Sequence, residues 1–83
     1  MEKSIYTTEY NAMLRLLRQA REDAGVTQVQ LATKLKLTQS LLSKMERGDV
    51  RLDIIQLRTI CRVLGTTLPA FVQELERELS SRR

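Results

Sequence analysis

The sequence predicts an all-helical fold of five short helices. No segment alternates apolar and polar residues with the period of a strand, whereas apolar residues recur at the i, i+3, i+4 spacing of helices. Signals for the start of a helix also occur three times along the chain. The 83 residues suit a single domain over residues 1–83, with its core between about residues 8 and 79.

The first helix is expected to begin near Thr7 or Thr8 and to end before Gly25, which can turn left-handed without strain. Residues 1–6 and 80–83 are expected to fray. Helical spacing places the following residues on the inward face: Tyr10, Met13, Leu14, Leu17, Ala20 or Arg21, and Ala24.

The next three helices share one start signal, a polar N-cap preceded by an apolar residue. The caps are Thr27, Thr38 and Asp53, and Gln30 completes a capping box with Thr27. Each cap contributes about 1 kcal/mol, which matters in a domain with a small core. The apolar residues around each cap form predicted staples: Val26–Leu31, Leu37–Leu42 and Leu52–Leu57.

Glycines are expected to end the third and fourth helices, at Gly48 and Gly65. The fifth helix is expected to start around Thr67 or Leu68 and to tolerate Pro69 in its first turn. The fourth helix has an apolar stripe of Leu57, Ile60, Cys61 and Leu64, and the fifth has one of Leu68, Phe71, Val72, Leu75 and Leu79.

Positive charge is concentrated in the middle of the chain. The whole chain carries a net charge of +4. Residues 27–51 hold five bases and two acids, whereas the segments on either side are close to neutral. This distribution favours a polyanionic partner for the central segment.

Several function classes are disfavoured by composition. The chain has no histidine and a single cysteine, Cys61, so it offers no disulfide and no metal-ligand spacing. We therefore expect no enzyme activity and no cofactor, with Cys61 as a small core residue. No apolar run is long enough to span a membrane and no signal peptide is evident, so we expect a cytoplasmic protein without membrane contact.

The second and third helices are short and only residues 36–38 separate them. Such helices must cross at a large angle, which predicts a helix-turn-helix over about residues 28–46. Residues left on the outer face of the third helix are Gln39, Ser40, Ser43 and Lys44. Glutamine can pair with adenine, lysine with guanine and serine with either, in a major groove that admits a helix. The alternative is that these are ordinary solvated side chains.

Residues around this motif are candidates for phosphate contacts. Gln28 opens the second helix, where N–H groups and a partial positive charge favour anions, although it could be an ordinary first-turn residue. The other candidates flank the third helix: Lys36, Thr38, Arg47 and Arg51.

Residues 14–75 resemble the Cro/repressor-type (XRE) helix-turn-helix family of phage and bacterial transcriptional regulators. The resemblance is carried by LRLLRQAREDAG (residues 14–25), TQVQLATKL (27–35), TQSLLSKMERG (38–48) and LRTICRVLGTTLPAF (57–71). It implies a compact five-helix bundle of the lambda repressor type, a homodimer and a transcriptional role. By position it implies phosphate binding by Gln28 and base contacts by Gln39, Ser40 and Lys44.

The chain departs from the family pattern at two places. Lys36 stands in the turn where relatives often have glycine; a left-handed lysine there would cost about 1 kcal/mol, unless the turn itself differs. After Gly48 the chain has Asp49-Val50-Arg51-Leu52-Asp53 in place of a segment with proline, and Asp49 puts negative charge near the expected phosphates.

A single module reads too few base pairs for selectivity, so we expect a homodimer on an inverted repeat in double-stranded DNA, with half-sites about 34 Å apart. The fifth helix is the candidate interface through Phe71, Leu75 and Leu79, although the first two could instead close the monomer's core. No small-molecule ligand is expected. Restriction-modification controllers, Cro-like repressors and antitoxins all fit this build. The alternative function is a protein-interaction module or antitoxin-like partner on the same fold.

Overall fold

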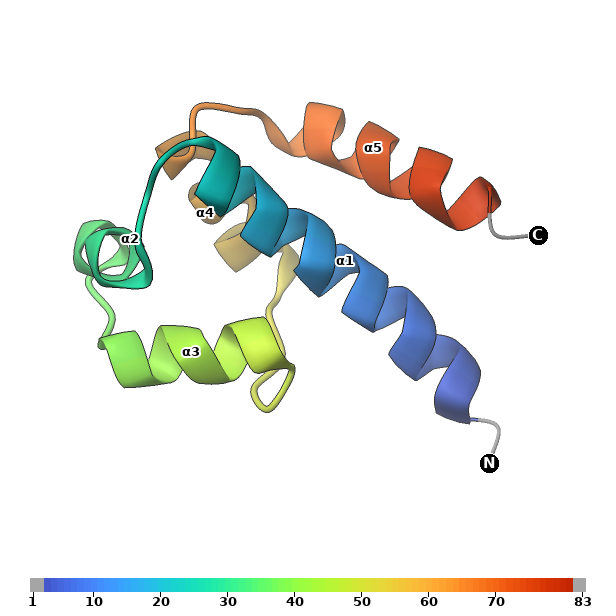
Figure 1. The fold of residues 1–83 in the computed structure, drawn as a ribbon, viewed down its shortest axis with the longest axis horizontal. Coiled ribbons are helices and arrows are strands. Elements are labelled where there is room, and N and C mark those ends of the chain that lie inside the picture. Colours follow the sequence, from blue (N-terminus) through green and yellow to red (C-terminus); the bar gives the residue numbers. More distant parts are fainter. Residues whose placement is uncertain (1–2, 82–83) are drawn as a thin grey trace.

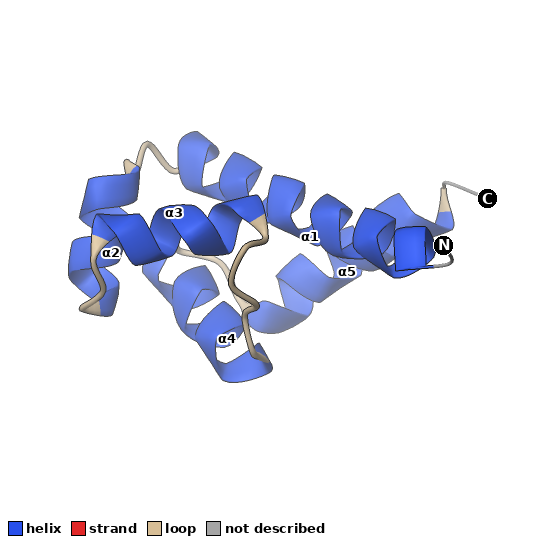
Figure 2. Cartoon of the chain, turned by 90° about the horizontal axis from the view of Figure 1, so that it is seen from below, coloured by secondary structure: helices blue, strands red, loops and turns tan. Residues whose placement is uncertain are grey.

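The computed structural model describes residues 3–81, with side chains from residue 8 onward. Its helices are α1 (Lys3–Asp23), α2 (Gln28–Leu35), α3 (Gln39–Arg47), α4 (Ile54–Val63) and α5 (Leu68–Ser80) (Figure 1). The part of the chain that is described contains no strand (Figure 2). The prediction of an all-helical five-helix fold is therefore confirmed.

The start of α1 was predicted wrongly. The helix begins at Lys3, four or five residues before the expected start at Thr7 or Thr8, so residues 3–6 are helical rather than frayed. The threonines are compatible with helix interior positions, and no glycine or proline interrupts the segment from residue 3 to residue 24. The expectation for residues 1–2 and 82–83 lies outside the described residues.

Helices α2 to α5 begin as the sequence predicts. Each follows a residue whose side chain accepts a hydrogen bond from the backbone N–H three positions later: Thr27, Thr38, Asp53 and Thr67. Gln30 donates its own N–H to Thr27 and accepts from the Thr27 N–H with its side chain, at 3.1 and 2.9 Å, which completes the predicted capping box. Gln56 does the same for Asp53. These bonds satisfy N–H groups that the helix cannot pair.

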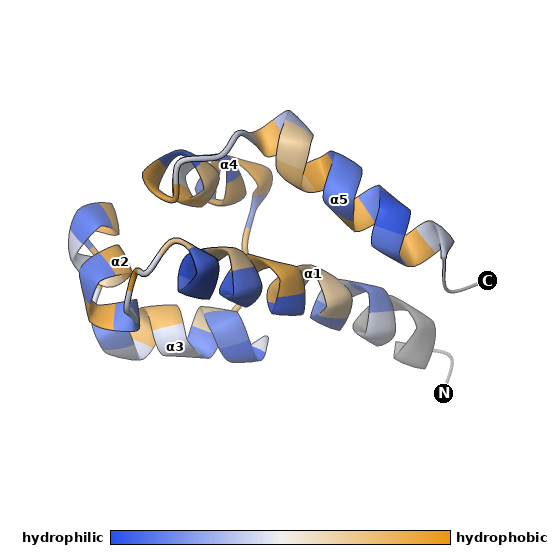
Figure 3. Cartoon of the chain, turned by 45° about the horizontal axis from the view of Figure 1, so that its top comes forward, coloured by the Kyte–Doolittle hydropathy of each residue, from blue (hydrophilic) through white to orange (hydrophobic). Residues whose placement is uncertain are grey.

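Every helix contributes to one apolar core. Its fully buried members are Leu17, Leu31, Ala32, Leu42, Leu57, Ile60, Cys61 and Phe71. Figure 3 shows apolar and hydrophilic residues on every helix, as expected when each buries one face. The prediction for Cys61 as a core residue is confirmed. Ala24 was predicted to face inward but is exposed, because α1 ends at Asp23 and Ala24 lies in the following turn.

The long helix α1 is the scaffold on which α3 and α5 pack. It contacts α3 and α5, while α4 contacts α2 and α5, and α2 contacts α3. Figures 1 and 2 show α3 and α5 on opposite sides of α1. The outer face of α3 is therefore left uncovered by the other helices that the structure describes. None of the described helices is long and apolar enough to cross a membrane.

Candidate nucleic-acid interface

The turn between α2 and α3 is closed by a left-handed residue. Lys36 has φ 60° and ψ 40°, and its N–H donates to the Thr33 carbonyl at 3.1 Å. The next N–H, of Leu37, donates to Ala32 at 2.9 Å, so two carbonyls at the end of α2 are satisfied. Lysine thus occupies the conformation that glycine adopts without strain, which is the first of the two alternatives that the sequence left open.

The polar face predicted for α3, which we call the candidate reading face, is formed by Gln39, Ser40, Ser43 and Lys44. Gln39, Ser40 and Lys44 are exposed and Ser43 is half-buried. On the opposite side of the helix Leu42 and Met45 are 1% and 2% exposed. The buried side fixes the rotation of α3 about its axis, and this rotation directs the polar set away from the bundle.

A buried ion pair attaches α3 to α1. The Arg21 Nε donates to the Glu46 carboxylate at 2.7 Å and a second guanidinium nitrogen donates at 3.2 Å. Both side chains are at most one-tenth exposed. A third guanidinium nitrogen donates to the Val26 carbonyl at 3.0 Å, in the loop before α2. This bidentate arrangement fixes both the distance and the orientation of the two helices.

Gln28 extends this network to the reading face. Its amide nitrogen donates to Glu46 at 2.9 Å, and because a carboxylate can only accept, this bond fixes the orientation of the amide. Its oxygen then faces α3 and accepts from the Gln39 Nε2 at 3.4 Å. The structure thereby brings together two predicted site residues that are 11 positions apart in the sequence.

Sequence reasoning missed the Arg21–Glu46 pair. Its one available signal was Arg21, a charged residue at an inward position of the α1 stripe, which requires a partner when buried. Nothing in the local pattern identifies the partner as Glu46, which lies 25 positions away.

The cations predicted to flank the reading helix lie at its two ends. Lys36 is exposed before α3, Arg47 is exposed as its last residue, and Arg51 is exposed in the following loop. Thr38 is also exposed, with its hydroxyl oxygen accepting from the Leu41 N–H at 3.1 Å as the cap of α3.

Arg47 is engaged on both sides. It donates to the Ser43 hydroxyl oxygen at 2.8 Å and to the Asp49 carboxylate at 3.0 and 3.2 Å. Asp49 therefore compensates the charge of Arg47 close to the reading face, although both side chains remain more than half exposed.

Beyond α3, Tyr10 on α1 contacts the following loop. The Arg51 guanidinium lies 4.4 Å from the centre of the Tyr10 ring, and the Tyr10 hydroxyl oxygen accepts from the Leu52 N–H at 3.0 Å.

The residues predicted for a dimer interface differ in exposure. Phe71 is 5% exposed and belongs to the monomer's core, as the alternative interpretation expected. Leu75 and Leu79 are half-buried on α5, and Val72 on the same helix is 38% exposed. Helix α5 therefore presents some apolar surface besides the part that closes the core.

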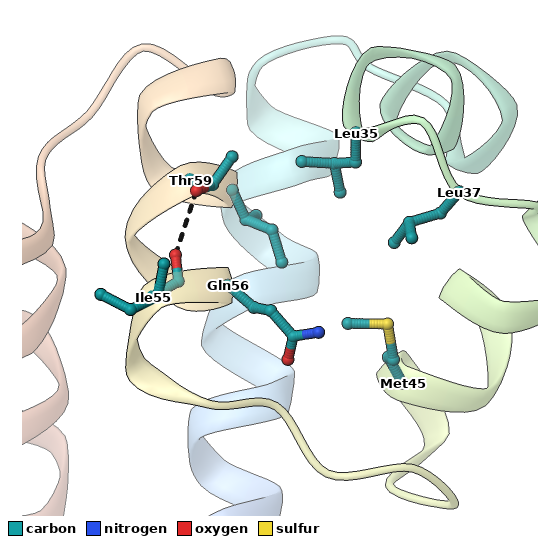
Figure 4. Close-up of a pocket in the computed structure, with 7 residues that line it drawn as sticks. Leu35, Leu37, Met45, Ile55, Gln56 and Thr59 are labelled. Atoms are coloured by element: carbon teal, nitrogen blue, oxygen red, sulfur yellow. Dashed lines mark hydrogen bonds between the residues drawn. The ribbon is translucent and has the colours of Figure 1, made fainter.

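An open hollow of about 200 Å³ lies between the α2–α3 turn and α4. In Figure 4, Leu35, Leu37 and Met45 line one side, and Gln56 lies across from Met45. The Thr59 hydroxyl donates its hydrogen to the Ile55 carbonyl at 3.0 Å, so this hydrogen is not available to a ligand in the hollow. The volume is below that of pockets that enclose drug-sized ligands, and we assign it no ligand.

Helices α2 and α3 are short and are joined by a left-handed turn, and the buried side of α3 directs its polar face outward. This arrangement defines a helix-turn-helix domain. A family model described as a helix-turn-helix domain matches residues 12–75. The chain belongs to this family, in its XRE-type branch, and the function of the class is DNA binding in transcription regulation.

The chain is similar to several solved structures, among them the following two. One is an XRE-family-like protein from Pseudomonas syringae pv. tomato, with 42% identity, a TM-score of 0.85, and coverage of 93% of this chain and 94% of that one. The other is the clp gene regulator ClgR from Corynebacterium glutamicum, with 27% identity, a TM-score of 0.77, and coverage of 89% and 79%. Among curated proteins, no sequence matches the chain.

Proposed function

We propose that the protein is a homodimeric transcriptional regulator that reads a specific inverted repeat in double-stranded DNA, with α3 in the major groove. The observation that carries this proposal is the link from the buried Arg21–Glu46 pair through Gln28 to Gln39. A side chain that is held in place before binding loses less entropy when it meets a base, and this favours selective contacts.

The chemistry of Gln39 suits adenine. Its amide has two N–H donors and one oxygen, and Gln28 accepts one of the N–H groups. The remaining N–H and oxygen are the pair that adenine N7 and the adenine amino group require. Gln28 therefore orients the Gln39 amide without using up its capacity to read a base.

Gln28 itself is suited to a phosphate. One of its amide N–H groups donates to Glu46, and the second is available for a DNA oxygen. The backbone N–H groups in the first turn of α2 and the positive end of its dipole favour an anion at the same place. Phosphate contacts of this kind set the register of the protein on DNA and carry no sequence information.

The other predicted contact residues lie around Gln28 and Gln39. Ser40 and Lys44 are exposed and would meet base edges, and Ser43, whose oxygen already accepts from Arg47, retains its hydroxyl hydrogen for donation. We assign phosphate contacts to the residues at the two ends of the reading helix: Lys36, Thr38, Arg47 and Arg51.

Dimerisation through α5 would place two reading helices one DNA turn apart. The half-buried Leu75 and Leu79 and the exposed Val72 supply the apolar surface for this contact. Phe71 contributes chiefly to the monomer's core. Because the structural relatives are bacterial proteins, whose DNA lies in the cytoplasm, we place the protein there.

The test is selection of binding sites from a random duplex pool at physiological salt, followed by measurement of the mass of the complex. One inverted repeat, with half-sites about 34 Å apart and two chains per duplex, is the expected result. Recovery of no consensus, together with binding that disappears as salt rises, would overturn sequence-specific reading and favour a protein-interaction or antitoxin-like role.

A further inference from the structure

We infer that Tyr10 on α1 is a positioning residue for DNA binding, which holds Arg51 and the loop after the reading helix in place to meet a phosphate. This inference rests on the proposed function, because it assigns a role to a residue outside the helix-turn-helix in the same interface. Tyr10 was singled out in the sequence only as a member of the inward face of α1.

The Tyr10 side chain makes two contacts with consecutive loop residues. Its hydroxyl oxygen accepts from the Leu52 N–H at 3.0 Å, across 42 positions in the sequence. Its ring lies under the Arg51 guanidinium, 4.4 Å from the carbon at the centre of that group, which is within the range of a cation–π interaction. The ring itself is half-buried, so its own position is fixed by the bundle, whereas Arg51 is exposed.

A backbone hydrogen bond to Tyr10 attaches this loop to α1, in addition to the packing of the Leu52 side chain against the apolar core. At the start of the loop, the N–H groups of Asp49 and Val50 donate to the Lys44 carbonyl, at 2.9 and 3.3 Å. At its end, the Asp53 N–H donates to the Gln56 side chain at 2.9 Å. These bonds attach each end of the loop to its neighbouring helix, whereas the bond from Leu52 to Tyr10 attaches it to the scaffold that also holds α3.

The arrangement leaves Arg51 able to bind a phosphate. The attraction to an aromatic ring acts through the face of the guanidinium, whereas the N–H donors lie in its plane and match phosphate geometry. Of the two acids in this loop, Asp49 is paired with Arg47 and Asp53 caps α4. Holding Arg51 against Tyr10 reduces the rotamer freedom that it would lose on binding.

Four variants test this inference: Tyr10→Leu, Tyr10→Phe, Arg51→Ala and the double variant Tyr10→Leu/Arg51→Ala. The probe is a short duplex of random sequence, because phosphate contacts do not depend on sequence. Affinity is measured against salt at a temperature at which thermal melting shows each variant to be folded. If Tyr10→Leu does not fold, Tyr10→Phe and its combination with Arg51→Ala take its place.

We expect Tyr10→Leu to weaken binding by about twofold to fivefold, the range of an exposed cation–π contact. The slope of log affinity against log salt concentration should also become less steep and approach that of Arg51→Ala. In Arg51→Ala the loss of one phosphate contact reduces the slope by about 0.9. The double variant should bind no more weakly than Arg51→Ala alone. Tyr10→Phe, which retains the ring, should keep the slope and lose less affinity than Tyr10→Leu.

Additive losses in the double variant would overturn the inference, because Tyr10 would then act independently of Arg51. A lower melting temperature with unchanged affinity and salt slope would also overturn it, by showing a purely structural role. Both results leave DNA binding by the parent chain intact. Failure of the parent chain itself to bind any duplex would instead overturn the proposed function, and the role of Tyr10 with it.

Discussion

The guanidinium of Arg21 and the carboxylate of Glu46 form a buried bidentate pair, at 2.7 and 3.2 Å, that joins the scaffold helix α1 to the reading helix α3. The same carboxylate accepts from Gln28, and among the described residues no buried polar side-chain atom lacks a partner. The pair therefore serves both the packing of α3 and the placement of a predicted DNA-contacting residue.

Removing one partner of this pair should be strongly destabilising. We expect Arg21→Ala or Glu46→Ala to lower the free energy of unfolding by about 3–5 kcal/mol, since each leaves a buried charge without compensation. Glu74→Ala is the matched control, because its ion pair with Arg77 is more than half exposed and should contribute about 0–1 kcal/mol. Urea denaturation measures all three. Equal small losses at both sites would contradict the assignment of a structural ion pair.

Local signals predicted most of the fold. The caps at Thr27, Thr38 and Asp53 each fix a helix start through bonds within three residues, so the sequence pattern alone identifies them. The start of α1 was missed because Thr7 and Thr8 resemble cap residues, whereas no glycine or proline between residues 3 and 8 prevents the helix from starting earlier.

The candidate site was only partly predictable. The outer face of α3 follows from helical periodicity, which predicted the exposed Gln39, Ser40 and Lys44 together with the half-buried Ser43. The partners of Arg21 and Tyr10 lie 25 and 42 positions away. Contacts over such separations depend on the packing of α1 against α3 and the following loop, which no local pattern specifies.

Lys36 should limit stability because it is the one non-glycine residue with positive φ among those described. Lys36→Gly should raise the free energy of unfolding by about 0.5–1 kcal/mol. Glycine relieves the left-handed strain, and the greater conformational entropy of the unfolded variant offsets part of this gain. Lys34→Gly, inside α2, should lower it by about 1 kcal/mol. The measurement is the urea midpoint of each variant, which reports stability when the dependence of the unfolding free energy on urea concentration is unchanged. A loss of stability in both would show that left-handed strain at residue 36 is negligible.

The Cys61 thiol should make stability sensitive to alkaline pH. Burial raises the pKa of this thiol above its ordinary value of 9.0, so the folded chain holds its proton when the unfolded chain begins to lose it. The contribution to stability is complete below about pH 9 and is lost as pH rises from there through the folded pKa. Urea midpoints from pH 7 to 10 should fall more for the parent chain than for Cys61→Ala. Parallel decreases would refute the prediction.

Asp49 should weaken DNA binding. It pairs with Arg47 at 3.0 Å and places a negative charge next to the expected phosphates. Asp49→Asn should therefore strengthen binding to a random duplex by about twofold to fivefold, as expected for an exposed pair worth 0.2–1 kcal/mol. The effect should diminish at high salt. Glu76→Gln, exposed on α5 on the opposite side of α1, is the control for a general change in charge. Equal gains in both variants would show that Asp49 has no local effect on Arg47.

Gln39 and Gln28 should differ in how they affect selectivity, although they are in contact. Gln39→Ala should cost about 1–3 kcal/mol on the selected site and much less on random DNA, because it removes a base contact. Gln28→Ala should weaken binding to both, through its phosphate. It should also lose part of the selectivity, since Gln28 orients the Gln39 amide at 3.4 Å. In a double-mutant cycle on the selected site the two losses should be less than additive. Equal losses for Gln39→Ala on selected and random duplexes, measured at one salt concentration, would rule out base reading by Gln39.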